Sequence, residues 1–175
     1  MKKQILITGT GGQGIKTIGD ILAKAAARQG LYPADYSIYT PQARGGDIVS
    51  SLVISDRPLT YPLVETADVA LILSDPLPAE LLFPVINGRE YPKLSPRTIV
   101  VYEDRPGNLP RICKKEREIK GLVTEPFSNL VVLGALQKLV PQIKSDCLWE
   151  IIKENFKKTS LEETKRQYEQ GQNLI

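Results

Sequence analysis

Histidine is absent from this 175-residue chain, and cysteine, methionine and tryptophan are scarce, with two, one and one residues. Histidine is the side chain that titrates near neutral pH, so its absence excludes Ser-His and Cys-His nucleophiles and most catalytic zinc or non-haem iron sites. An iron–sulfur cluster usually takes four thiolates, and Cys113 and Cys147 supply only two. Most hydrolytic and electron-carrying chemistry is therefore excluded for this chain acting by itself.

Long apolar runs and a dominant charge are also missing. No run approaches the roughly 18 apolar residues of a membrane span, and the N-terminal apolar stretch is too short for a signal peptide. The 23 basic and 20 acidic residues are mixed along the chain, with no basic stripe interleaved with aromatic residues. We expect a cytoplasmic protein that binds neither nucleic acid nor membrane, with its cysteines as free thiols rather than a disulfide.

Strand-length apolar runs alternate with helical patterns along the chain. Strands are expected at residues 5–8, 36–39, 48–54, 69–73 and 98–102, with a weaker one at 119–123, and helices at residues 15–26, 79–83, 129–139, 148–156 and 160–171. This alternation predicts a three-layer α/β/α Rossmann-like domain with a largely parallel sheet. We expect residues 1–175 to form a single domain with an irregular middle at about 76–110, where seven prolines fall.

Two of the expected helices carry signals for their N-termini. A cap is expected at Ser145 or Asp146, just before the helix that contains Leu148. The last helix opens with Ser160 and has Glu163 three residues later, which is the pattern of a capping box.

The apolar residues of the expected elements are interpreted as packing residues. Residues 130–139 are apolar nearly all round, so we expect them in the core rather than at a partner surface. Trp149, Ile152 and Phe156 are expected to pack as well. Tyr36 and Tyr39 are expected to pack on the sheet rather than to stack on a cofactor ring.

A glycine-rich turn joins the first expected strand to the first expected helix. Its sequence, Gly9-Thr10-Gly11-Gly12-Gln13-Gly14, matches G-x-G-x-x-G. Glycines permit a tight turn, let backbone N–H groups approach a ligand, and place an anion at the positive end of the helix dipole. Asp35 follows Gly14 by 21 residues, the spacing of a ribose-binding acid, but it precedes the apolar part of its strand rather than ending it. A dinucleotide site and a bare turn without a ligand both stay open.

A second loop follows the second expected strand and contains Arg44, Gly45 and Gly46. In a parallel α/β sheet, ligands bind beyond the carboxyl ends of the strands, which is where both this loop and the glycine turn are expected. A guanidinium beside flexible glycines suits recognition of a phosphate or carboxylate. We favour a joint site or interface built by the two loops over a hairpin-like turn with a solvated arginine.

Several segments of the chain match one family in order and spacing. They are the glycine turn, Leu22-Ala23, Ala25-Ala26, Pro41-Gln42-Ala43-Arg44-Gly45-Gly46, Ile54-Ser55-Asp56, Tyr61-Pro62, Ala67-Asp68-Val69, Asn129-Leu130-Val131-Val132-Leu133-Gly134-Ala135-Leu136 and Tyr168-Glu169-Gln170-Gly171. Together they resemble the gamma subunit of 2-oxoacid:ferredoxin oxidoreductases, which is a fused domain in multidomain pyruvate:ferredoxin oxidoreductases. Gln42 departs from the glutamate usual there, residues 74–78 break the helix usual after Leu73, and residues 84–118 carry no match.

The resemblance implies oxidative decarboxylation of a 2-oxoacid, such as pyruvate or 2-oxoglutarate, to an acyl-CoA by a multisubunit complex. Thiamine diphosphate, magnesium and iron–sulfur clusters are then expected in partner subunits, with electrons passing to ferredoxin and coenzyme A as co-substrate. The implied partners are alpha and beta subunits and, in a complex of four kinds of chain, a delta subunit. This chain lacks the Gly-Asp-Gly and downstream Asn-Asn that hold magnesium and thiamine diphosphate, so we expect it to bind no cofactor alone and to be inactive alone.

The role implied for this chain is to pack against the thiamine-binding subunits and to shape the site where coenzyme A approaches. It would supply no catalytic residue and no metal ligand. The implied binding residues are Gly9, Gly11, Gly12, Gln13, Gly14, Arg44, Gly45, Gly46 and Asn129. Gly11 to Gly14 would offer backbone or amide donors, Arg44 a cation and Asn129 a hydrogen bond from a helix.

A stand-alone Rossmann-type protein that binds NAD or a flavin nucleotide is the alternative. A phosphate-binding loop of the Walker type is weaker still, because no lysine stands at the position that G-x-x-x-x-G-K-[ST] requires. The resemblance also implies that the choice of 2-oxoacid belongs to other subunits.

Overall fold

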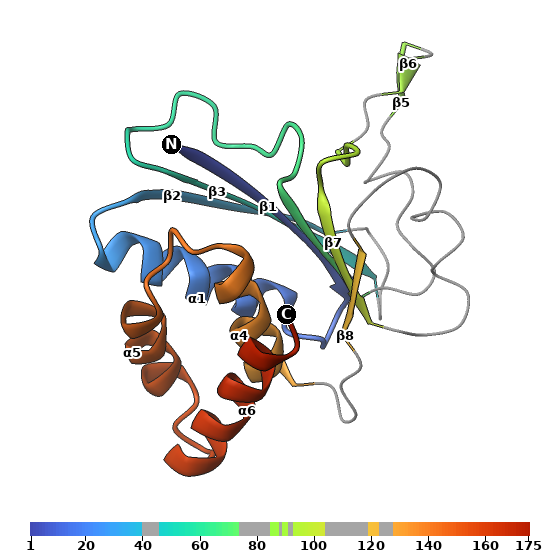
Figure 1. The fold of residues 1–175 in the computed structure, drawn as a ribbon. Coiled ribbons are helices and arrows are strands. Elements are labelled where there is room, and N and C mark those ends of the chain that lie inside the picture. The colour runs from blue at the N-terminus through green and yellow to red at the C-terminus, as the bar shows by residue number, and fades with distance from the viewer. Residues whose placement is uncertain (40–45, 74–84, 88, 91–92, 104–118, 123–127) are drawn as a thin grey trace.

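The computed structural model describes residues 1–39, 46–73, 85–87, 89–90, 93–103, 119–122 and 128–175 (Figure 1). The elements in chain order are β1 (Lys2–Thr10), α1 (Ile15–Arg28), β2 (Tyr32–Tyr39), β3 (Asp47–Ser55), β4 (Val69–Ile72), β5 (Val85–Ile86), β6 (Arg89–Glu90), β7 (Ile99–Glu103), β8 (Ile119–Leu122), α4 (Asn129–Leu139), α5 (Ser145–Asn155) and α6 (Leu161–Asn173). The α/β class is confirmed, and so are the expected strands and four of the expected helices. The helix expected at 79–83 lies outside the described residues, as does most of the proline-rich middle.

Six of the strands form one mixed sheet in the order β2-β3-β1-β4-β7-β8, and β5 pairs with β6 apart from it. The pairs β1–β4, β4–β7 and β7–β8 are parallel, whereas β3 is antiparallel to both of its neighbours, β1 and β2. The expectation of a largely parallel sheet is thus correct for one half of the sheet and wrong for the other. Only residues 40–46 separate β2 from β3. A parallel pairing needs a crossover of a dozen or more residues, so the chain turns back as a hairpin instead.

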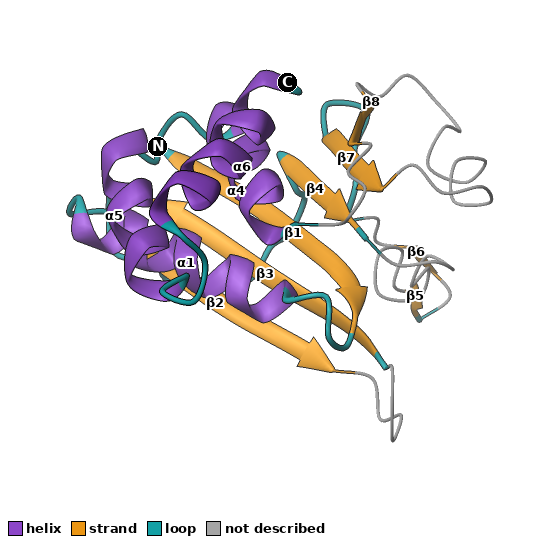
Figure 2. Cartoon of the chain, turned by 90° about the horizontal axis from the view of Figure 1, so that it is seen from below, coloured by secondary structure: helices purple, strands orange, loops and turns teal. Residues whose placement is uncertain are grey.

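The four described helices lie on one side of the sheet (Figure 1), and Figure 2 shows the same arrangement from the helical side. Strand alternation explains this: in β1, Ile5 and Ile7 join the core under the helices, while Leu6 joins a smaller core on the opposite face. That second face is covered by Val64, Leu94 and other apolar residues of described loop segments. The described residues contain two of the three expected layers, namely the sheet and one layer of helices. No helix in this part of the chain is both long and apolar enough to cross a bilayer.

Helix α4 is buried nearly all round, as its composition predicts, and α6 crosses it at very short range. A Cβ built on Gly134 would overlap the carbonyl oxygen of Tyr168, and one built on Gly171 would overlap the carbonyl of Val131. The two glycines therefore let the backbones of α4 and α6 meet. Tyr168 also stacks on Trp149 of α5, with ring centroids 5.7 Å apart, so α6 holds both neighbouring helices.

The helix ends agree in part with the expected caps. Ser160 caps α6, since its Oγ accepts a hydrogen bond from the Glu163 N–H at 3.3 Å. The cap expected at Ser145 or Asp146 is wrong: the N-cap of α5 is Lys144, and both residues lie in the first turn. The Ser145 hydroxyl instead lies 3.2 Å from the Tyr168 hydroxyl on α6.

Helix α1 packs on the sheet through Gly19, which lies over two polar side chains. The Ser50 hydroxyl donates to Asp35 Oδ1 at 2.6 Å, and a Cβ on Gly19 would lie 2.7 Å from Ser50 Oγ and 3.1 Å from Asp35 Oδ2. Burial raises the pKa of the Asp35 carboxyl, the bond from Ser50 lowers it, and the charge of Asp20 adds to the rise.

The expectation that Tyr36 and Tyr39 pack on the sheet is wrong. Both belong to β2, which lies at one edge of the sheet, and their exposed fractions are 53% and 55%. Trp149 and Phe156 do pack against the main core, and Ile152 is fully buried in it. Cys147 is a free, half-buried thiol, whereas Cys113 lies outside the described residues.

Replacing Gly134 with alanine is expected to destabilise the protein by about 2 kcal/mol or more, because the new methyl group meets backbone that cannot rotate away. Gly11→Ala is a matched control, since its Cβ would meet only the Gly46 carbonyl oxygen at 3.8 Å. Urea unfolding of the two variants measures the difference. Equal midpoints would show that α4 and α6 are free to move apart.

Asp35→Asn is expected to raise the stability at pH 7 and to leave it nearly unchanged near pH 3. The folded-state pKa of Asp35 is raised, so protonation favours folding and that contribution is lost as the pH rises above the unfolded-state value. Asparagine keeps the acceptor for Ser50 and carries no charge at any pH. Thermal unfolding at the two pH values tests this, and a loss of stability at pH 7 alone would contradict it.

Candidate functional site

The glycine turn between β1 and α1 is a compact structure that leaves the helix N-terminus uncapped. Gly14 is the N-cap of α1 with φ of +75°, and no side chain caps the helix. Gly12 also has a positive φ, +96°, which side chains other than glycine rarely adopt. The first turn of α1 contains no acidic residue. The positive end of the α1 dipole therefore faces outward from this turn without a compensating charge of its own.

Gln13 holds the turn to the sheet with both ends of its amide. Its Oε1 accepts from the Thr10 N–H at 2.7 Å, and its Nε2 donates to the Leu73 carbonyl at 2.9 Å. A Cβ on Gly9 would overlap this amide and the Ile15 side chain, so Gly9 makes room for the arrangement. The Gln13 side chain thus fixes the turn above the end of β4.

The glycine turn and Gly46, the described end of the second loop, meet at one end of strands β1 and β3. Thr10 pairs with Asp47 in the ladder between β1 and β3, and the Gly11 N–H donates to the Gly46 carbonyl at 3.0 Å. The expectation that their glycines lie close together is confirmed for Gly11 and Gly46. Arg44 and Gly45 lie outside the described residues.

Asn129, the first residue of α4, lies directly against the glycine turn. A Cβ on Gly14 would overlap its Nδ2 and would lie 3.0 Å from its Cγ. Within the described part of the chain, the Asn129 Oδ1 is buried and has no hydrogen-bond partner. The structure therefore brings together Gly14 and Asn129, two predicted site residues that are 115 positions apart in the sequence.

A cavity of about 330 Å³ opens between these two helix N-termini. Its lining residues come from the glycine turn, the start of α4, the end of α5 and α6: Gly12, Gln13, Ser128, Asn129, Leu130, Phe156, Thr159 and Gln167. Like α1, α4 has no acidic residue in its first turn. The cavity is polar, lies at two positive helix ends, and suits a ligand that carries negative charge or carbonyl oxygens.

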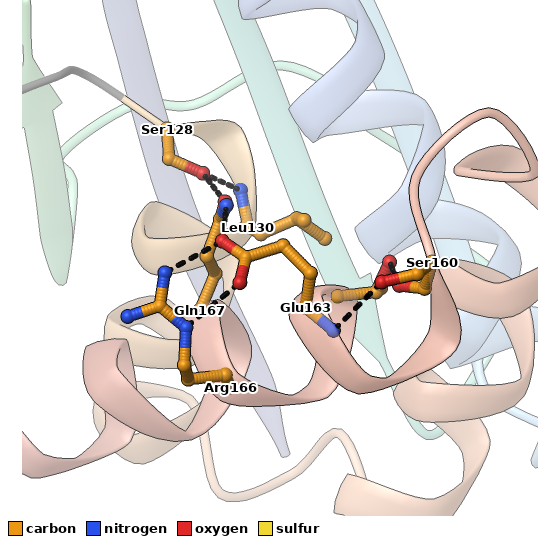
Figure 3. Close-up of polar contacts among 7 residues, drawn as sticks. Ser128, Leu130, Ser160, Glu163, Arg166 and Gln167 are labelled. Atoms are coloured by element: carbon orange, nitrogen blue, oxygen red, sulfur yellow. Dashed lines mark hydrogen bonds and ion pairs between the residues drawn. The ribbon is translucent and has the colours of Figure 1, made fainter.

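One wall of the cavity is fixed by polar contacts between α6 and the N-cap of α4 (Figure 3). Arg166 donates to the Glu163 carboxylate from Nε at 2.8 Å and from Nη2 at 2.7 Å. Gln167 Nε2 donates to Glu163 Oε1 at 2.5 Å, and the Ser128 hydroxyl donates to Gln167 Oε1 at 2.5 Å. The bonds from Arg166 first, and that from Gln167 second, lower the pKa of the Glu163 carboxyl to about 2.

Asp35, the candidate ribose-binding acid, does not belong to this site. It pairs with Leu52 in the middle of the β2–β3 ladder and binds Ser50 under α1. In addition, no group of three or more cysteine, aspartate or glutamate side chains among the described residues is arranged to hold a metal ion.

Sequence reasoning missed the α5 and α6 side of the cavity. The sequence indicates Phe156 only as a packing residue, and Thr159 and Gln167 carry no local signal of their own. The one available clue is the spacing of Glu163, Arg166 and Gln167, which puts the three side chains on one face of a helix. That spacing says nothing about Ser128, which is 39 positions from Gln167.

The sequence of this chain matches known proteins of one family. Residues 4–173 match the family described as pyruvate ferredoxin/flavodoxin oxidoreductase. The 2-oxoglutarate synthase subunit KorC of Archaeoglobus fulgidus is 30% identical over 139 residues, which are 78% of this chain and 70% of that one. The common gamma subunit of the pyruvate/ketoisovalerate oxidoreductases of Thermococcus kodakarensis is 27% identical over 170 residues, 87% of this chain and 86% of the relative.

A solved structure has the same fold. It is the 2-oxoglutarate:ferredoxin oxidoreductase from Magnetococcus marinus with 2-oxoglutarate, coenzyme A and succinyl-CoA bound, with a TM-score of 0.79, 24% identity and coverage of 99% of this chain. This chain spans 31% of the Magnetococcus chain. The family match over nearly all residues and the relative at 30% identity decide the assignment. The chain belongs to the pyruvate ferredoxin/flavodoxin oxidoreductase family.

Proposed function

We propose that this chain is the gamma subunit of a multisubunit 2-oxoacid:ferredoxin oxidoreductase and that it shapes the entrance through which coenzyme A reaches the reacting acyl group. The observation that carries the proposal is the meeting of the glycine turn and Asn129 at one polar cavity in a member of this family. We propose residues 1–175 as a single domain that works in the cytoplasm, in contact with alpha, beta and, where present, delta subunits.

In this role the chain binds and orients coenzyme A and does not itself carry out redox chemistry. The reaction converts a 2-oxoacid and coenzyme A to an acyl-CoA and carbon dioxide, and the electron pair passes to ferredoxin. Thiamine diphosphate with magnesium and the iron–sulfur clusters supply that chemistry from other subunits when bound. Two cysteines cannot hold a cluster that usually takes four thiolates, and the chain lacks the Gly-Asp-Gly and downstream Asn-Asn that hold magnesium and thiamine diphosphate.

The proposed donors for coenzyme A follow from which hydrogen bonds are already made inside the chain. The Gly11 N–H and the Gln13 side chain bind Gly46 and Leu73, so their part is to hold the turn in shape. The N–H groups of Gly12, Gly14 and the first turn of α1 are the donors that we propose for a phosphate or carbonyl oxygen. Asn129 adds an amide at the cavity, and Arg44 with Gly45 and Gly46 adds a cation on the adjoining loop.

The stand-alone NAD or flavin protein is the less favoured function. Its acidic ribose ligand would be Asp35, which is engaged with Ser50 in the middle of a strand. NAD or FMN is expected to leave the thermal midpoint of the purified chain unchanged, and the chain is expected to be colourless. A shift of several degrees with either nucleotide would favour this alternative.

Arg44→Ala is expected to raise the KM for coenzyme A by about tenfold in the assembled complex, because a charge-assisted hydrogen bond contributes about 1.5–3 kcal/mol. The kcat at saturating coenzyme A is expected to stay within about twofold, since the role proposed for Arg44 is to bind coenzyme A and not to take part in the chemical step. Steady-state kinetics of the complex, with ferredoxin or a dye as acceptor, measure both constants.

Arg57→Ala is the matched control, because Arg57 is also a loop arginine but follows β3 at the opposite end of the strand from Arg44. It is expected to leave the KM unchanged. The same KM for both variants, together with unchanged assembly, would contradict the proposal for Arg44.

A further inference from the structure

A series of hydrogen bonds connects the N-cap of α4 with Glu163 on α6, and in each bond the donor lies on the side nearer α4 (Figure 3). The Leu130 N–H donates to Ser128 Oγ at 3.3 Å, the Ser128 hydroxyl donates to Gln167 Oε1, and Gln167 Nε2 donates to the Glu163 carboxylate. Each group is therefore an acceptor toward α4 and a donor toward Glu163. Bonds aligned in this way polarise and strengthen one another.

The charge of Glu163 is what sets this direction. An ionised carboxylate only accepts hydrogen bonds, so it selects the NH₂ end of the Gln167 amide and turns the oxygen end toward Ser128. The Ser128 hydrogen must then point to Gln167, which leaves an oxygen lone pair for the Leu130 N–H. Glu163 thus decides the orientation of two groups that can otherwise rotate or flip.

The Glu163 side chain has a different partner from the one that its sequence position predicts. In a capping box it would fold back onto the N-cap of its own helix. The Ser160 half of that motif is present, but the Glu163 carboxylate binds Arg166 and Gln167. Its charge consequently acts on the N-terminus of α4, which has no acidic residue in its own first turn.

This series of hydrogen bonds ends beside Asn129 and Gly14, the residue pair at the cavity. Ser128 directly precedes Asn129, and Asn129 lies against Gly14 at the N-terminus of α1. A fixed N-cap of α4 therefore fixes the position of Asn129, the next residue. Ser128 and Gln167 also line the cavity themselves.

We propose that Glu163 is a positioning residue for the cavity between the two helix N-termini: acting through Gln167 and Ser128, it holds Asn129 against Gly14 in the geometry that admits coenzyme A. The coenzyme A part of this inference rests on the function proposed above. The Glu163–Gln167–Ser128 relay itself does not.

The relay is tested in the full chain by exchanging its two central side chains. Glu163→Gln is expected to speed hydrogen exchange of the Leu130 amide by about fivefold and to shift the side-chain NH₂ resonance of Asn129, because the cap loses its link to a charge. Gln167→Glu is expected to do the same by placing two carboxylates in contact. The double variant E163Q/Q167E restores one carboxylate, which now accepts directly from Ser128, and is expected to return the exchange rate to within about twofold of the parent.

Glu162→Gln is the matched control, since Glu162 is an exposed glutamate in the same first turn of α6 and its substitution removes the same charge. It is expected to change neither readout. Equal effects of Glu162→Gln and Glu163→Gln, or a double variant that recovers nothing, would overturn the relay.

The assembled complex tests the link to coenzyme A. Glu163→Gln is expected to raise the KM for coenzyme A by about fivefold at unchanged kcat, and E163Q/Q167E to restore it. If the exchange rates respond but the KM changes for Arg44→Ala alone, the positioning role is overturned while the proposed function stands. If the exchange rates respond and no variant, Arg44→Ala included, alters the KM, the relay stands and coenzyme A is the wrong ligand.

Discussion

Two helix N-termini can meet in this protein only because Gly14 has no side chain. The Asn129 amide occupies the volume that a Cβ at Gly14 would need, and the backbone at Gly14 has the left-handed conformation that glycine adopts without strain. That contact places the start of α4 beside the glycine turn, and the polar cavity opens between them. The pairing of Thr10 with Asp47 then brings the start of β3, and with it the end of the β2–β3 connection, to the glycine turn.

Much of the fold could be predicted from the sequence because its signals are local. The apolar run of β1, the periodicity of α1 and the uniformly apolar α4 each depend on neighbours in the chain, and all three elements form as expected. The direction of β3 was missed, although the short link between β2 and β3 already excludes a crossover. Tyr36 and Tyr39 were misjudged because propensity indicates a strand but not whether that strand lies at an edge.

The candidate site could be predicted on one side only. The glycine turn has a recognisable spacing, and Asn129 was found through the family resemblance rather than through any property of its own position. Gln167 and Ser128 meet across the packing of α4 on α6, which depends on Gly134 and Gly171. Contacts of this kind are set by tertiary structure, so no local pattern reports them. Glu163 accepts from Arg166 and Gln167 one turn further along its own helix instead of folding back onto its N-cap, and Gln167 in turn accepts from Ser128 at the neighbouring helix.

The β2–β3 hairpin gives the chain a place to change in length. The pairing of Tyr39 with Ile48 fixes both ends of the connection, so an insertion within residues 40–46 would not shift the register of either strand. Lengthening such a loop is inexpensive, at about 0.6 kcal/mol for each doubling. Related chains can therefore differ in the length of this connection without a change in the pairing of β2 with β3.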